Sequence, residues 1–139
     1  MQQRAVRPAT IMIVEDNEDT RHVYSIMLRH SGFDVVEAAT GPEAVLQASA
    51  HTLDLILMDM NLPDIDGCEA ARQIKSDPAS GTAPLVAFSA LIDSVAELRL
   101  RNAPFDGFIA KPVTASELVR RVSAYIDLLK SRAASPPLS

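Results

Sequence analysis

The sequence predicts an α/β fold in which a parallel sheet of five strands is covered by helices on both faces. Five short apolar segments alternate along the chain with five segments of helical pattern, the order expected of parallel strands joined by crossover helices. The apolar segments are bounded by turn residues, as strands buried on both faces are. A chain of 139 residues without an internal repeat suits a single domain.

The predicted strands are the segments richest in apolar and β-branched residues. The first is cut off by Glu15-Asp16, and the third ends abruptly at Asp59. The second is more polar than the others, which indicates a place nearer an edge of the sheet. The five predicted strands are residues 10–14, 33–38, 55–58, 85–88 and 107–110.

Start and stop signals define the predicted helices between these strands. Thr40 and Thr114 each stand three residues before a glutamate, which is the spacing of a capping box. Gly32 follows the first helix at the position where a left-handed cap is common. The predicted helices are residues 17–30, the segment from Thr40 to about Ala50, and about 68–76, 93–102 and 115–129. The predicted domain is 10–129, with residues 1–9 as a flexible lead and 130–139 as a disordered tail.

Each predicted helix has an apolar stripe that should face the sheet, and the stripe is clearest in the last one. The predicted inward residues are Val23, Ile26 and Met27 in the first helix, Ala44, Val45 and Ala48 in the second, Ala71 and Ile74 in the third, Val95 and Leu98 in the fourth, and Leu118, Val122, Tyr125, Ile126 and Leu129 in the fifth.

Composition narrows the classes of function. The formal net charge of -5 argues against non-specific binding to nucleic acid or to a membrane surface. The single cysteine, Cys68, excludes an intrachain disulfide and a cysteine-rich zinc cluster, and fits a cytoplasmic location. We find neither a signal peptide nor an apolar run of about 18 residues, the length that spans a bilayer.

Polar residues end four of the five predicted strands: Glu15-Asp16, Asp59, Ser89 and Lys111. The carboxyl ends of parallel strands meet at one edge, where open α/β sheets bind ligands. Two carboxylates about 4 Å apart repel by roughly 4 kcal/mol at an effective dielectric near 20, so a cation is expected among them, and oxygen ligands suit Mg²⁺. The pattern is equipped for phosphoryl transfer, with Asp59 attacking phosphorus, Mg²⁺ and Lys111 neutralising its oxygens, and Ser89 donating a hydrogen bond.

Four motifs in this order resemble those of response-regulator receiver domains of the single-domain type. They are Ile-Val-Glu-Asp at 13–16, Leu-Met-Asp-Met-Asn-Leu-Pro at 57–63, Phe-Ser-Ala at 88–90 and Ala-Lys-Pro at 110–112. The resemblance covers about residues 10–129. It implies a flavodoxin-like, doubly wound sheet of order 2-1-3-4-5 and a cis Lys111-Pro112 bond.

The resemblance also implies roles for individual residues. Asp59 would take a phosphoryl group from a phosphohistidine on a histidine kinase or a histidine phosphotransfer protein. Glu15, Asp16, Asp59 and the backbone carbonyl of Asn61 would hold Mg²⁺ or Mn²⁺, with Glu15 acting through water because it is longer than the commoner Asp. Such a protein is a phosphoacceptor regulator and not an ordinary enzyme, since it catalyses only its own phosphorylation and slow dephosphorylation.

Signal output is implied to use Ser89 and Phe108 as a switch, so that phosphate draws Ser89 inward and Phe108 fills the vacated space. The surface of the fourth helix, fifth strand and fifth helix would then bind an unknown downstream protein, with no nucleic-acid or membrane partner. The alternative for Phe108 is ordinary core packing. Pro104 stands where the family usually has Gly, so Asn102 or a reshaped loop must make the turn there.

Three other functions remain open at this point. The chain could be a docking module of the same fold that works without phosphorylation. It could be an acid-nucleophile phosphohydrolase, although Asn61 stands where that class has its second acid. A flavodoxin-like FMN carrier is a further alternative, but the acidic segment 15–19 would repel a phosphate unless a cation intervened.

Overall fold

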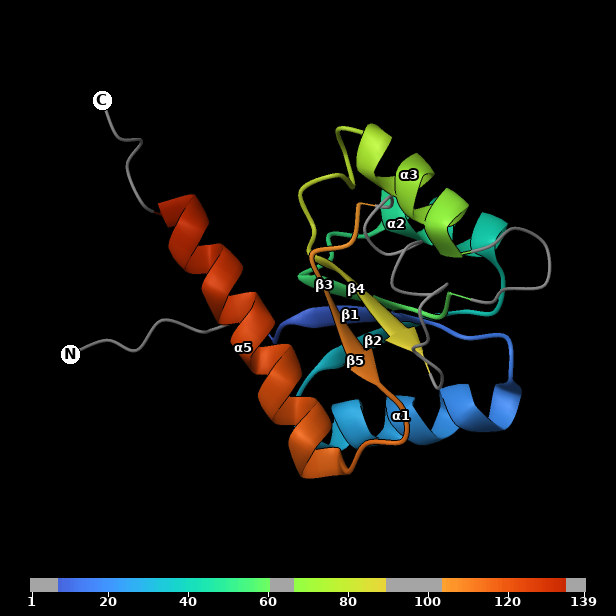
Figure 1. Ribbon diagram of the computed structural model, residues 1–139, viewed down its shortest axis with the longest axis vertical. Helices are drawn as coiled ribbons and strands as arrows, with labels where there is room; N and C mark the ends of the chain where they lie inside the picture. The colour runs from blue at the N-terminus through green and yellow to red at the C-terminus, as the bar shows by residue number, and fades with distance from the viewer. Residues whose placement is uncertain (1–7, 61–66, 90–103, 135–139) are drawn as a thin grey trace.

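The computed structural model describes residues 8–60, 67–89 and 104–134. Its centre is a five-stranded parallel sheet of order β2-β1-β3-β4-β5 (Figure 1), which confirms the predicted order. The polar strand β2 lies at an edge, as predicted, and the apolar β3 lies in the middle. The strands are β1 (Thr10–Val14), β2 (Asp34–Ala38), β3 (Leu55–Met58), β4 (Leu85–Ser89) and β5 (Gly107–Ala110).

Helices cover both faces of this sheet, with α1 and α5 on one face and α2 and α3 on the other (Figure 1). The described ranges hold the helices α1 (Glu18–His30), α2 (Gly41–Ala50), α3 (Gly67–Ser76) and α5 (Ala115–Ala134). The helix predicted at 93–102, with Val95 and Leu98, lies outside the described residues. No helix in these ranges has the length and the apolar run needed to cross a membrane.

Strand β3 separates the two halves of the core. Leu55 and Leu57 pack toward α1 and α5, while Ile56 and Met58 pack toward α2 and α3. All four side chains are fully buried, as the alternation of side chains along a doubly covered strand requires. The end of β3 therefore has a fixed direction, and the residue that follows it, Asp59, is placed by the centre of the sheet.

Helix α1 has well-defined ends. The Asn17 side chain accepts a hydrogen bond from the Thr20 backbone N–H at 2.9 Å, which caps the N-terminus. Gly32 has a φ of 98°, the left-handed conformation that the sequence predicted. Phe33 N–H donates to the Leu28 carbonyl at 3.1 Å, and this bond completes a Schellman motif. The chain between β1 and β2 is thereby fixed at both ends of the helix.

The inner face of α1 differs from the prediction. Val23 and Ile26 are 48% and 50% exposed, whereas Tyr24 and Leu28 are buried. Apolar residues occupy nearly every position from 23 to 28, so periodicity alone did not select one face. The choice follows from packing, because the Tyr24 ring lies edge-to-face against Phe88 of β4 with ring centroids 4.8 Å apart.

The other predicted helix faces are confirmed where the structure describes them. The predicted inward residues that are buried or partly buried are Met27 on α1, Ala44, Val45 and Ala48 on α2, Ala71 and Ile74 on α3, and Leu118, Val122, Tyr125 and Ile126 on α5. The side chain of Leu129 lies outside the described set.

Helix α5 is longer than predicted. It continues to Ala134 and so includes residues 130–134, which were predicted to belong to a disordered tail. These residues read Lys-Ser-Arg-Ala-Ala, and Lys, Arg and Ala are among the best helix formers. The first proline of the segment is Pro136. Composition indicated a tail, but the helix-breaking residues begin only after Ala134.

The loop before β5 is held by a charged pair. Asp106 accepts hydrogen bonds from the Leu85 backbone N–H at 2.7 Å and from Lys75 Nζ at 3.0 Å. Lys75 also donates to the Ala83 carbonyl at 2.9 Å. The turn after Pro104 is thus tied to α3 and to the start of β4, while Asn102 lies outside the described residues.

Gly81 marks the closest backbone approach after α3. A Cβ at this position would lie 2.7 Å from the Lys75 carbonyl oxygen and 2.9 Å from that of Asp77. Because both are backbone atoms, Gly81→Ala should lower the free energy of unfolding by about 1–3 kcal/mol, as overpacking does. Urea unfolding measures this value. The neighbouring exposed residue supplies the control, since Thr82→Ala should change stability by less than about 0.5 kcal/mol; equal midpoints for the two variants would contradict the expectation.

Candidate functional site: an acidic cluster at the carboxyl edge of the sheet

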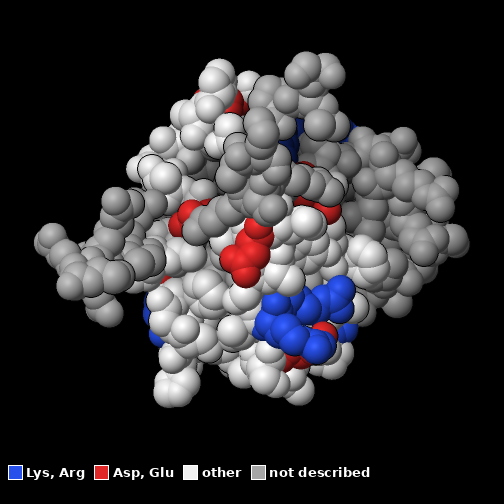
Figure 2. Space-filling view, turned by 90° about the vertical axis from the view of Figure 1, so that its left-hand side faces the viewer, with Lys and Arg blue, Asp and Glu red and all other residues white. Residues whose placement is uncertain are grey.

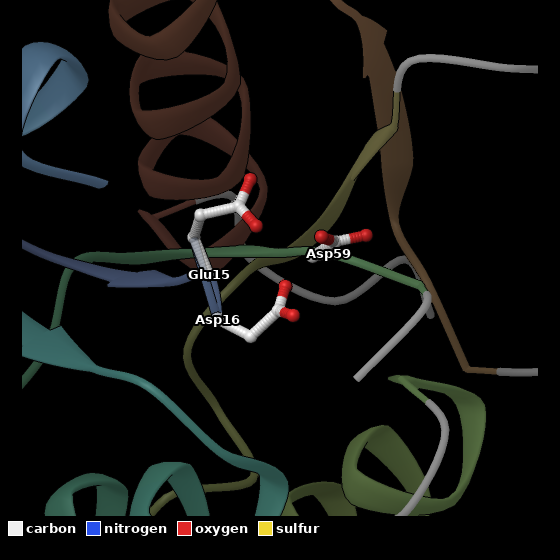
Figure 3. A group of neighbouring side chains, drawn as sticks. All are labelled: Glu15, Asp16 and Asp59. Atoms are coloured by element: carbon white, nitrogen blue, oxygen red, sulfur yellow. The ribbon is translucent and has the colours of Figure 1, made fainter. Parts of the chain in front are cut away.

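Three carboxylates lie together at the ends of β1 and β3 (Figure 3). Glu15 and Asp16 follow β1, and Asp59 follows β3. One carboxylate oxygen from each of the three residues lies within 4.8 Å of the corresponding oxygens of the other two. The two strands are parallel neighbours, and Asp59 N–H donates to the Val14 carbonyl at 3.0 Å. The sheet itself therefore brings these acids together, as the sequence predicted.

Lys111 enters the same site from the end of β5. Its ammonium donates a hydrogen bond to a Glu15 carboxylate oxygen, and Nζ lies 3.9 Å from Asp59 Oδ2. The Lys111 side chain is only 12% exposed, and Nζ lies 5.1 Å from the centre of the Phe88 ring. The Lys111-Pro112 bond is cis, as predicted. One ammonium thus pairs with two of the three carboxylates.

Glu15 is the most buried of the three acids. It is 4% exposed, whereas Asp16 is exposed and Asp59 is intermediate. One Glu15 carboxylate oxygen binds Lys111, and the other accepts from the Asn17 backbone N–H at 3.3 Å. The sequence did not predict this pairing with Lys111. The additional methylene of Glu gives the carboxylate the reach to make it.

The remaining predicted site residues are only partly described. Ser89 is the last residue of β4 and pairs with Ala110 of β5, but its side chain lies outside the described set. Asn61 also lies outside the described residues. Phe108 lies on β5 and is 42% exposed. That exposure contradicts the alternative in which Phe108 is an ordinary core residue.

Arg21 contacts the site and Glu37 pairs with Arg21, and neither residue was predicted from the sequence. Arg21 donates to the Glu15 backbone carbonyl at 2.8 Å and to the Glu37 carboxylate at 3.2 Å. Glu37 lies on β2, 16 positions away from Arg21 along the chain. Opposite charges on a predicted helix and the strand that follows it are the signal that could have suggested this pair.

The donor set of the cluster fits a hard divalent cation. Its ligands are carboxylate oxygens only, without sulfur or imidazole among the three residues, and Mg²⁺ prefers oxygen. Three neighbouring carboxylates and one ammonium leave a net negative charge, which a divalent ion would offset. The residues present are therefore chemically suited to hold Mg²⁺.

Comparison with known proteins decides the family. The sequence model of the response regulator receiver domain matches residues 11–123. The chain belongs to this family. Receiver domains are the signalling modules of two-component systems, they bind Mg²⁺ in an acidic pocket, and histidine kinases are their partners.

Individual receiver proteins show the extent of the similarity. The polar-differentiation response regulator DivK of Brucella anthropi is 31% identical over 119 residues, which are 86% of this chain and 97% of that protein. The receiver domain of the sensor histidine kinase PA1611 of Pseudomonas aeruginosa is 32% identical, with a TM-score of 0.82 over 87% of this chain and 99% of that domain, and carries a magnesium ion in its active-site cleft. The chemotaxis protein CheY4 of Vibrio cholerae, 22% identical with a TM-score of 0.80 over 85% of this chain and 98% of that protein, shares the fold.

Proposed function

We propose that this receiver domain accepts a phosphoryl group on Asp59 and transmits the signal through a changed protein partner. The observation that carries the proposal is the meeting of Asp59 with Glu15, Asp16 and Lys111 at one edge of the sheet. The donor would be a phosphohistidine of a histidine kinase or of a histidine phosphotransfer protein. In the transfer, an Asp59 oxygen forms a bond to phosphorus, the bond from phosphorus to the imidazole nitrogen breaks, and its electron pair returns to the ring.

The neighbouring residues have separate tasks in this proposal. Asp16, Asp59 and the Asn61 backbone carbonyl would hold Mg²⁺ or Mn²⁺, which when bound supplies positive charge to the phosphoryl oxygens. Lys111 supplies a fixed positive charge, because burial and the Phe88 ring confine its ammonium. Ser89 would donate a hydrogen bond to the phosphoryl group.

Glu15 has a different task from the other two acids. Its carboxylate is occupied by Lys111 and by a backbone N–H, and the PA1611 receiver domain shows that a related cleft holds magnesium. We therefore assign Glu15 to the ion site through water and to Lys111 directly. A phosphoryl group on Asp59 would compete with Glu15 for the Lys111 ammonium.

The output surface in this proposal lies on β5 and α5. Phe108 and Leu128 are 42% and 49% exposed, and a groove of about 220 Å³ is lined by Arg121, Ala124, Tyr125 and Leu128. Figure 2 shows the side of the molecule that carries α5, where a group of basic side chains lies below the centre with acidic side chains next to it and above it. Apolar residues beside mixed charges suit a protein partner. Ser89 and Phe108 would link this surface to the phosphorylated site.

Incubation with acetyl phosphate tests the proposal. In Mg²⁺, the intact mass should rise by one phosphoryl group, and EDTA should prevent the gain. Asp59→Asn should abolish the gain, because the amide is not a nucleophile for phosphorus. Asp34→Asn, at an exposed site on β2, should behave as wild type.

Two outcomes would overturn the proposal. If the folded wild-type protein gains no mass in Mg²⁺, Asp59 is not a phosphoacceptor. The function that then fits the fold is a docking module that works without phosphorylation. A gain that persists in Asp59→Asn would move the acceptor to another residue.

A further inference from the structure

Arg21 connects the acidic site to the edge of the sheet. Its guanidinium is largely buried, with the side chain 17% exposed. Nη1 donates to the Glu15 carbonyl oxygen at 2.8 Å, and Nε donates to Glu37 Oε1 at 3.2 Å. The second Glu37 oxygen accepts from Arg29 at 3.2 Å. The Glu37 carboxylate, which Arg29 also binds, therefore holds the Arg21 guanidinium in place. The guanidinium in turn holds the Glu15 backbone carbonyl.

The carbonyl that Arg21 holds occupies a special place in the chain. It belongs to the peptide unit between Glu15 and Asp16, at the point where the chain leaves the sheet. Glu15 N–H still donates to the Ala38 carbonyl of β2 at 3.0 Å. Because a peptide unit is planar, a fixed carbonyl also fixes the α-carbons on both sides of it. The bond from Arg21 thus restrains the backbone from which both acidic side chains project.

Arginine is well suited to this task. Its donors form a rigid planar fork, so a guanidinium that makes two bonds retains little freedom. Lysine carries the same charge on a flexible stem and offers no comparable fork. A charge-assisted hydrogen bond to a carbonyl is also stronger than a neutral one. These properties distinguish a geometric role for Arg21 from a role of its charge.

We propose that Arg21 is a positioning residue for the divalent-ion site, which acts through the Glu15-Asp16 peptide and does not touch the ion. This inference rests on the proposed function, because it presupposes that the acidic cluster binds the ion. Groups that orient metal ligands typically change metal affinity 10- to 100-fold when they are removed. Arg21→Gln should therefore weaken Mg²⁺ binding about tenfold.

Simple electrostatics predicts the opposite sign. Arg21 is a positive charge beside a cation site, so its removal alone makes the site more negative and should strengthen Mg²⁺ binding. Arg29 provides the matched control. It also pairs with Glu37, but its other bond goes to the Val35 carbonyl and not to the Glu15 carbonyl. Arg29→Gln should leave Mg²⁺ affinity unchanged or slightly raised.

Calorimetric titration of the unphosphorylated protein with Mg²⁺ alone measures these affinities. The series is wild type, Arg21→Gln, Arg21→Lys and Arg29→Gln, each checked for folding by its urea midpoint in EDTA. Arg21→Lys keeps the positive charge, so a loss of Mg²⁺ affinity in this variant must come from the changed hydrogen-bond geometry. The same variant tests the proposal if Arg21→Gln does not fold. We expect weaker binding in both Arg21 variants and wild-type binding in Arg29→Gln.

The outcomes separate this inference from the proposed function. If wild type binds Mg²⁺ and the folded Arg21 variants bind it equally or more tightly, the positioning role is wrong and the proposed function stands. If Arg29→Gln loses as much affinity as Arg21→Gln, the effect comes from Glu37 and not from the Glu15 carbonyl, and the positioning role is again wrong. If wild type binds no Mg²⁺, both proposals fail.

Discussion

Lys111→Met should lower the free energy of unfolding by about 3 kcal/mol in EDTA, and Mg²⁺ should restore much of this loss. The Lys111 ammonium is the cation bound to the buried Glu15 carboxylate, and it also lies 3.9 Å from Asp59. Removing one partner of a buried ion pair leaves an uncompensated charge and typically costs about 3–5 kcal/mol. We expect the lower end because the Lys111 side chain retains 12% exposure.

Magnesium separates this effect from ordinary loss of packing. The site loses a positive charge in Lys111→Met, so it should bind Mg²⁺ more tightly and gain more stability from the ion than wild type does. Urea unfolding with and without Mg²⁺ gives both quantities. Lys75→Met is the control. Lys75 also forms an ion pair, with Asp106 at a distance of 3.0 Å, but this pair is not part of the acidic cluster. Lys75→Met should lose stability that Mg²⁺ does not return, and an equal magnesium increment in the two variants would refute the expectation.

Phe88→Ala should lower the free energy of unfolding by about 3–5 kcal/mol, the usual range for a buried phenylalanine. Phe88 is 2% exposed and lies in the core between the sheet and the α1–α5 layer. Its ring contacts Tyr24 edge-to-face and lies beneath the Lys111 ammonium. Truncation therefore opens a cavity and removes an aromatic pair and a cation–π contact at once.

Urea unfolding in Mg²⁺ and in EDTA measures the effect of Phe88→Ala. Phe108→Ala is the control. It removes the same type of side chain from the neighbouring strand β5, where the phenylalanine is 42% exposed. Because half-exposed apolar area contributes less, its loss should be about 1 kcal/mol. Similar losses in the two variants would show that burial at Phe88 is not the source of its stability.

The strands could be predicted almost to the residue because each is a short buried run closed by polar or turn residues. Residues 10–14, 55–58 and 107–110 match β1, β3 and β5. The inner face of α1 could not be predicted in the same way. Val23, Tyr24 and Ile26 all have apolar side chains or rings, and the choice among them follows from packing against Phe88 on the sheet face that α1 covers.

The site followed from the sequence as far as topology determines it. Asp16, Asp59 and Lys111 meet because parallel strands end at one edge, and that rule needs no coordinates. The Glu15–Lys111 pair depends on the reach and rotamers of two long side chains. The Arg21–Glu37 pair depends on how α1 lies over β2. Contacts of these two kinds require the folded arrangement.

The position of Glu37 on the edge strand β2 also affects how the molecule behaves in concentrated solution. Strand β2 is five residues long, and among the described residues it pairs with β1 on one side only. Its exposed Asp34, and Glu37 with its partners Arg21 and Arg29, place charged side chains along this strand. Charges on a short edge strand oppose pairing with the edge of another copy. The strand that anchors Arg21 thereby also discourages sheet extension and aggregation.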